Sequence, residues 1–121
     1  MSVYALRGAT TEEENDREAI LEATAEMMAE LLEKNSLAAE DLVSAIFTVT
    51  DDLDAEFPAV AAREMGLSSV PLLCAREIPV PGSMPGVVRV LVHYRSQAPG
   101  DPHHVYLRRA SELRGDLGSA Q

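Results

Sequence analysis

An apolar run, Val70-Pro71-Leu72-Leu73, leads directly into Cys74-Ala75-Arg76-Glu77. This pattern predicts a short buried strand over residues 70–74 whose carboxyl end carries a thiol, a guanidinium and a carboxylate. Cationic and phenolic side chains are spread along the rest of the chain: Arg7, Arg63, Arg89, Tyr106 and Arg114. Gathered around one strand end, these groups would form a pocket suited to a small, doubly charged, hydroxylated anion.

Length and composition favour a single globular domain over residues 1–121, because 46% of the residues are hydrophobic and 25% are charged. The sequence has no apolar run long enough to cross a bilayer and no amino-terminal signal segment, so we expect a cytoplasmic protein. A single cysteine excludes an internal disulfide, and no Cys and His residues have the spacing of a zinc site. The net charge of −10 argues against binding to nucleic acid or anionic membranes.

The amino-terminal part of the chain predicts a strand over residues 2–6 and a long helix over residues 16–34. Between them, Gly8 suits a turn, and Thr11 with Glu14 fits a capping box at the start of the helix. Glutamates crowd this helix, and we interpret them as a solvated face.

The rest of the chain alternates irregularly between strand and helix patterns. Further elements are expected as strands over residues 42–50, 70–74 and 87–95, a short helix over 59–65, a stiff loop over 79–86, a helical or turn segment over 104–113 and a frayed tail from about 115 to 121. The strand over 42–50 is apolar on both faces, which predicts that both faces are covered. We therefore expect an α+β or mixed α/β fold that contains a long and a short helix.

Arg89 is the most informative single residue, because it interrupts an apolar strand. A buried guanidinium needs a partner, since burying an unpaired charge is costly. That partner is either a fixed carboxylate such as Glu77 or the oxygen atoms of a ligand, and the position of Arg89 favours neither. Glu77 in turn fits a general base, an acceptor for a ligand hydroxyl or a structural counter-ion.

The remaining reactive side chains have a structural and a functional interpretation. Cys74 fits a nucleophile, although cysteine is more often a small buried apolar residue. Tyr106 fits either a core residue with a bonded hydroxyl or a site residue. His103 and His104 are adjacent, which is poor geometry for a metal, so we expect both on the surface. The sequence contains no Gly-rich phosphate loop and no evident Ser/His/Asp set.

Short motifs spread over nearly the whole chain carry a family resemblance. They are Arg7-Gly8-Ala9-Thr10-Thr11, Asp52-Leu53, Phe57-Pro58-Ala59, Ala62-Arg63-Glu64, Val70-Pro71, Cys74, Glu77, Arg89-Val90, His104-Val105-Tyr106-Leu107 and Leu113-Arg114-Gly115-Asp116-Leu117. In this order and with this spacing, they resemble the small trimeric chorismate mutases, a family distinct from the all-helical chorismate mutases.

The resemblance implies an α+β fold in which a long and a short helix pack on a mixed β-sheet. It also implies a homotrimer that forms a pseudo-α/β-barrel, with sites in clefts between neighbouring subunits. It implies the pericyclic (Claisen) rearrangement of chorismate to prephenate, on the route to phenylalanine and tyrosine, with no cofactor and no metal. Such a reaction needs a compact substrate conformer and stabilisation of the negative charge that develops on the breaking ether oxygen. Several arginines in one cleft of an acidic protein suit a dianionic substrate.

The resemblance also implies a role for each candidate residue. Arg89 would bind the ether oxygen and a carboxylate, and Glu77 would accept a hydrogen bond from the ring hydroxyl, with Cys74 beside it. Arg7 and Tyr106 would hold the side-chain carboxylate. The other implied substrate contacts are Phe57, Ala59 and Leu73 in an apolar wall, Arg63 and Arg114 near the mouth, and Leu113.

Two other functions remain open from the sequence. A non-catalytic trimer that binds carboxylate metabolites would use the same scaffold, and direct formation of prephenate would separate it from the enzyme. A deaminase-type trimer of similar architecture also uses an interface arginine, but its usual motifs are not apparent in this sequence.

Overall fold

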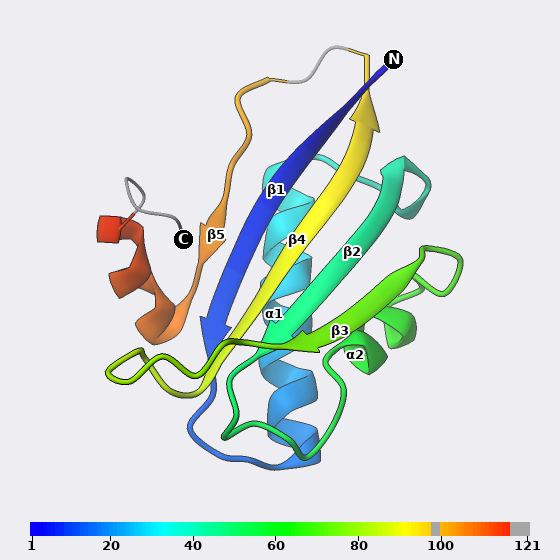
Figure 1. Ribbon diagram of the computed structural model, residues 1–121. Coiled ribbons are helices and arrows are strands. Elements are labelled where there is room, and N and C mark those ends of the chain that lie inside the picture. The colour runs from blue at the N-terminus through cyan, green and yellow to red at the C-terminus, as the bar shows by residue number, and fades with distance from the viewer. Residues whose placement is uncertain (98–99, 117–121) are drawn as a thin grey trace.

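A five-stranded sheet with the strand order β3-β2-β4-β1-β5 organises the chain (Figure 1). The computed structural model describes residues 1–97 and 100–116, with side chains up to Leu113. The strands are β1 (Ser2–Thr11), β2 (Leu42–Val49), β3 (Leu72–Arg76), β4 (Val87–Ser96) and β5 (Val105–Tyr106). The α-helices are α1 (Arg17–Lys34) and α2 (Ala59–Glu64), and the 3₁₀ helices are η1 (Ala39–Asp41) and η2 (Arg108–Asp116).

The sheet is mixed, as the family resemblance implies. Its central strand β4 runs antiparallel to both β1 and β2, whereas β3 is parallel to β2 and β5 is parallel to β1. The long helix α1 lies behind the sheet in the view of Figure 1, and the short helix α2 packs beside it. The predicted α+β fold and the bounds of both helices are therefore confirmed to within one or two residues.

We call the side of the sheet that packs against α1 the helix face, defined by Leu6, Phe47, Val88, Val90 and Val92. All five side chains are buried. They form one core cluster with apolar residues of the two α-helices: Ile20, Met27, Met28, Leu31, Ala59 and Ala62. Burial of each large apolar side chain contributes roughly 1.5–3 kcal/mol relative to leaving it exposed. This face therefore supplies most of the driving force for folding of the single chain.

The predicted turn at Gly8 is wrong, because β1 continues through it to Thr11. Gly8 lies where α1 comes closest to the strand: a β-carbon there would approach Val90 Cγ1 to 3.1 Å and Met27 Cγ to 3.3 Å. The glycine therefore permits close helix–sheet packing instead of a turn. The predicted capping box is also wrong, since the helix is capped by Asp16.

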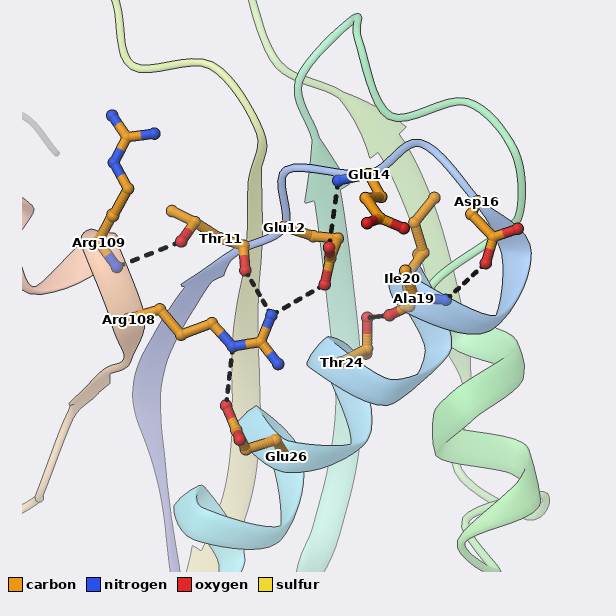
Figure 2. A network of polar contacts seen from close by, with 10 residues as sticks. All are labelled: Thr11, Glu12, Glu14, Asp16, Ala19, Ile20, Thr24, Glu26, Arg108 and Arg109. Carbon is orange, nitrogen blue, oxygen red and sulfur yellow. Dashed lines mark hydrogen bonds and ion pairs between the residues drawn. The ribbon is translucent and has the colours of Figure 1, made fainter.

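Asp16 accepts a hydrogen bond from the backbone N–H of Ala19 at 3.1 Å, as Figure 2 shows. A carboxylate at this position satisfies a free N–H of the first turn and interacts favourably with the positive end of the helix dipole. The predicted capping pair, Thr11 and Glu14, precedes Asp16 in the sequence, and Thr11 is the last residue of β1. The extension of the strand therefore moves the start of the helix away from Thr11.

The predicted buried strand is β3, and it is not buried in the single chain. It forms an edge of the sheet, and its residues alternate between half-buried and exposed, with Leu73 61% exposed. The prediction that both faces of β2 are covered is also wrong within one chain. Phe47 on the helix face is buried, but Ile46 and Thr48 on the opposite face are half-buried.

We call this opposite side of the sheet the open face, defined by Arg7, Ile46, Leu73, Arg89 and Leu91. At its β1 edge, η2 turns onto the sheet. Ala110 and Leu113 of η2 form a small second cluster with Ala9 and Val87. The predicted helical or turn segment over residues 104–113 thus contains a two-residue strand followed by a 3₁₀ helix.

The frayed tail expected from about residue 115 stays a prediction, because 117–121 lie outside the described residues and Gly115 and Asp116 end η2. Within the described part of the chain, none of the helices combines the length and the apolar character needed to cross a bilayer.

Candidate active site

A cavity of about 270 Å³ lies on the open face, between the sheet and η2. Residues from several elements line it: Arg7, Gly8, Ala9, Ile46, Thr48, Arg89, Val90, Leu91, Tyr106 and Leu113. The strand register explains why they meet. Arg89 pairs with Thr48 on one side and with Ala9 on the other, and Ala9 pairs with Tyr106. Residues far apart in sequence thus form one continuous row across β2, β4, β1 and β5.

Arg89 and Glu77 lie together at one end of this row. The distance from Arg89 Nε to Glu77 Oε2 is 3.5 Å, and the two side chains are 29% and 27% exposed. This is longer than the roughly 2.7–2.9 Å of a charge-assisted hydrogen bond. The pair is therefore a loose ion pair at the edge of a cavity. Both alternatives left open by the sequence are represented, since Arg89 faces a fixed carboxylate and also lines a pocket.

Two hydrogen bonds with residues of β2 hold Glu77 in place. Its backbone N–H donates to the Val49 carbonyl at 2.8 Å, one step beyond the end of β3. The Thr48 hydroxyl donates to Glu77 Oε2, the same oxygen that faces Arg89. These contacts fix the position of the carboxylate, so Glu77 can act as a fixed acceptor.

His104 is a residue near the site that sequence reasoning misses. Predicted on the surface, it is instead half-buried, and its Nδ1 accepts the backbone N–H of Arg7 at 3.0 Å. Burial lowers the pKa of His104 below its usual value, and the positive charge of Arg7 lowers it further. Its place directly before the strand Val105–Tyr106 is the signal that would have indicated a role in pairing with β1.

Two other candidates, Phe57 and Cys74, line a second hollow of about 380 Å³ between β3 and the loop that leads into α2. Cys74 pairs with the buried Phe47 and packs against the core, so it points away from the open face. The expectation that Cys74 lies beside Glu77 is therefore not met within one chain. Phe57 is 65% exposed and reaches into solvent at the rim of this hollow.

The remaining candidates are dispersed around the two hollows. Leu113 lines the cavity on the open face, and Leu73 lies on the same face, opposite Ile46. Arg63 is exposed on α2, whereas Ala59 is only 2% exposed and belongs to the core. The side chain of Arg114 lies outside the described part of the structure.

The described residues contain no group of three or more His, Cys, Asp and Glu side chains arranged to hold a metal ion. What they offer is an apolar floor with two guanidiniums, a carboxylate and a phenol at its edges. Such a site can orient a small polyanion and stabilise charge that develops on one of its oxygens.

Comparison with known proteins identifies the class to which this fold and site belong. A family model, chorismate mutase type I, matches residues 3–117. The chain is 53% identical to the chorismate mutase AroH of Thermus thermophilus over 121 residues, which cover 98% of this chain and 99% of that protein. It is 38% identical to chorismate mutase AroH of Bacillus subtilis over 119 residues, which cover 97% of this chain and 94% of the relative.

A solved structure agrees with the sequence comparison. A chorismate mutase from Clostridium thermocellum superposes with a TM-score of 0.88 at 47% identity, covering 91% of this chain and 99% of the other. The chain therefore belongs to the type I chorismate mutase family. It is accordingly an isomerase, and the resemblance stated from the short motifs is confirmed.

Proposed function

We propose that this chorismate mutase converts chorismate to prephenate in the cavity on the open face, and that a neighbouring copy completes the site in a homotrimer. The observation that carries the proposal is the convergence of Arg7, Arg89 and Tyr106 on one cavity, with Glu77 at its edge. These groups come from three strands and from the loop after β3. A site of this kind binds a dianion without a nucleophile or a metal.

Arg89 is the group that acts on the reacting atoms. As the C–O bond of chorismate breaks, the ether oxygen gains negative charge that it lacks in the bound substrate. A guanidinium aimed at that oxygen stabilises the transition state more than the ground state, which is what accelerates a reaction. A preorganised donor of this kind contributes roughly 3 kcal/mol, or about a hundredfold in rate.

The other polar groups fix the conformer that reacts. Arg7 and Tyr106, which lie on the neighbouring strands β1 and β5 and both line the cavity, take the side-chain carboxylate. Glu77, as a carboxylate, accepts a hydrogen bond from the ring hydroxyl. It does not act as a general base, because no proton is transferred in the rearrangement. Holding the two ends of the substrate together selects the compact geometry, and this entropic advantage is a large part of catalysis.

The homotrimer is supported by what the single chain leaves uncovered. Leu73 is 61% exposed, Phe57 is 65% exposed and Val3 is 58% exposed. Leu73 and Val3 lie on the open face, and Phe57 lies at the rim of the second hollow. Exposed apolar side chains of this kind suit burial against a second chain. A cyclic assembly would bring Phe57 and Cys74 of one copy to the open-face cavity of the next, since a heterologous contact joins two different surfaces. We also propose a cytoplasmic location.

The test is a direct assay with the purified protein. Loss of chorismate absorbance, with prephenate identified as the product, is expected without any added cofactor and in the presence of EDTA. Light scattering is expected to give about three times the 13.1 kDa chain mass. Binding of chorismate without turnover would instead support the non-catalytic carboxylate-binding trimer, and strict dependence on a metal would refute the mechanism.

A further inference from the structure

A network of polar contacts around Arg108 lies outside the lining of the cavity (Figure 2). Arg108 is the first residue of η2, and its guanidinium reaches back across the end of β1 toward α1. Its Nη1 donates to the Thr11 carbonyl at 3.0 Å and to Glu12 Oε1 at 2.9 Å. Its Nε donates to Glu26 Oε1 at 3.2 Å. One side chain therefore ties η2 to β1, to the loop after β1 and to α1.

The two carboxylates that face Arg108 differ in their environment. The side chain of Glu12 is 13% exposed, that of Glu26 is 52% exposed, and that of Arg108 is 32% exposed. Burial alone would lower the pKa of Arg108, but Glu12 and Glu26 together raise it, so the arginine stays charged. The contact with Glu12 is the more shielded of the two and therefore the less sensitive to salt.

The backbone at Arg108 adopts a conformation that a residue with a β-carbon rarely takes, with φ at +52°. Strain of this kind persists where the surroundings hold it in place. On either side, the N–H of Leu107 donates to the Ala9 carbonyl at 2.9 Å, and the N–H of Arg109 donates to Thr11 Oγ1 at 3.2 Å. The chain is thus fastened to β1 at the point where it turns onto the open face.

This turn connects two residues of the cavity. Tyr106 lies two positions before Arg108 and Leu113 lies five positions after it, and both line the cavity. Beyond the turn, η2 is held by a small cluster in which Ala110 and Leu113 pack on Ala9 and Val87. Among the described side chains, the apolar cluster that holds this wall of the cavity is small, so the position of the wall also depends on the polar contacts at its start.

We propose that Arg108 is a positioning residue for the mutase reaction, whose ion pairs with Glu12 and Glu26 hold η2 where it closes one wall of the substrate cavity. This inference rests on the proposed function in one respect, that the substrate occupies this cavity. Arg108 does not line the cavity, so its effect on the reaction passes through Tyr106 and Leu113. Loosening the contact weakens substrate binding more than it slows the chemical step.

The test compares Arg108→Asn with Arg109→Ala in the full chain. Asparagine tolerates a positive φ, so the substitution removes the ion pairs without adding strain. Arg109 is exposed, loses the same charge, and keeps its backbone contact with Thr11 as alanine. For Arg108→Asn, KM for chorismate is expected to rise on the order of fivefold, with kcat within about twofold. For Arg109→Ala, KM and kcat are expected to stay near the wild-type values. Arg108→Lys keeps the charge and is expected to have a KM between those of the wild type and Arg108→Asn.

A second variant avoids the strained residue altogether. The double change Glu12→Gln and Glu26→Gln leaves Arg108 in place and is expected to raise KM in the same way, with faster hydrogen exchange at the Ala110 amide in both variants. Unchanged KM in Arg108→Asn and in the double variant would overturn the inference, as would an equal rise of KM in Arg109→Ala.

The failure of this inference is distinguishable from failure of the proposed function. A wild-type protein that does not form prephenate contradicts the function. Equal exchange at Ala110 in wild type and Arg108→Asn contradicts the positioning role, whatever the activity.

Discussion

The helix face and the open face are built from the same strands, but their side chains have different roles. On the helix face, Phe47, Val88 and Val90 are buried against α1 and α2. On the open face, their direct neighbours Thr48 and Arg89 line a cavity. Because successive side chains of a strand point to opposite faces, one residue specifies the fold and the next carries the chemistry. Stability and activity should therefore respond to substitutions at alternate positions.

The largest effect is expected from a deletion on the helix face. Phe47 is completely buried, so Phe47→Ala removes apolar contacts and leaves a cavity, at a cost of about 3–5 kcal/mol in the free energy of unfolding. Ile78→Ala is the matched control, because Ile78 is 80% exposed and its truncation should cost less than about 0.5 kcal/mol. Urea unfolding at a fixed protein concentration measures both. Equal losses would contradict the division between the faces.

The opposite response is expected at Arg89, the neighbour of Val88 and Val90 on the other face. Arg89→Lys keeps a charge but loses the planar fork that contacts two oxygens, so kcat should fall about a hundredfold or more. The melting temperature should stay close to that of the wild type, because lysine keeps the charge that faces Glu77 and the pair is loose, at 3.5 Å. Steady-state kinetics and thermal melts decide this together. A near-normal kcat would assign Arg89 to a structural pair.

A smaller loss is expected at Glu77. Glu77→Gln keeps the shape and an acceptor but loses the charge, and should lower kcat/KM by about tenfold, in line with one charge-assisted hydrogen bond. Glu77→Ala should lower it further. A solvent isotope effect is not expected for either protein, because no proton moves in the rearrangement. A large isotope effect in the wild type would show instead that Glu77 acts as a base.

The smallest effect is a dependence of stability on pH through His104. Because burial and Arg7 lower its pKa in the folded state, the neutral ring is favoured there. The stability linked to His104 is therefore present above its unfolded pKa near 6.5 and is lost as the pH falls through its lower folded value. His104→Asn, which keeps an acceptor and cannot titrate, should flatten the fall in melting temperature between about pH 7 and pH 5.

His103→Asn is the control for this measurement, since His103 is exposed. Its melting temperature should follow the wild-type pH profile. If His103→Asn and His104→Asn flatten the profile equally, the contact with Arg7 is not the origin of the effect.

Strong periodicity made α1 and β4 predictable from the sequence, and the apolar alternation around Arg89 correctly indicated a charged side chain on a strand. What could not be predicted came from contacts between distant elements. Gly8 suggests a turn by local rules, but the approach of Met27 to the sheet gives the glycine its place in a strand. Likewise, nothing local in residues 70–74 says that β3 is an edge strand, since strand order depends on pairing with β2.

In the candidate site too, local patterns predict some residues, whereas others depend on contacts between distant elements. Arg7, Arg89, Tyr106 and Leu113 were named from the sequence and do line one cavity. The roles of His104 and Arg108 cannot be predicted in this way, because they depend on hydrogen bonds to β1 and to the loop after it that join residues almost a hundred positions apart. The family resemblance implies that Cys74 lies beside Glu77, but within one chain the alternation of side chains along β3 directs the two residues to opposite faces.

The claim that one copy supplies the open-face cavity and the next supplies the hollow of Phe57 is tested by mixing two inactive proteins. Arg7→Ala and Phe57→Ala chains, each impaired alone, are co-expressed with different tags, and trimers that carry both tags are assayed. Each mixed trimer in a cyclic arrangement has one intact site out of three, so the double-tagged trimers should regain about one third of the wild-type activity. If mixed trimers stay as inactive as the parents, both residues act from the same chain and the shared site is wrong.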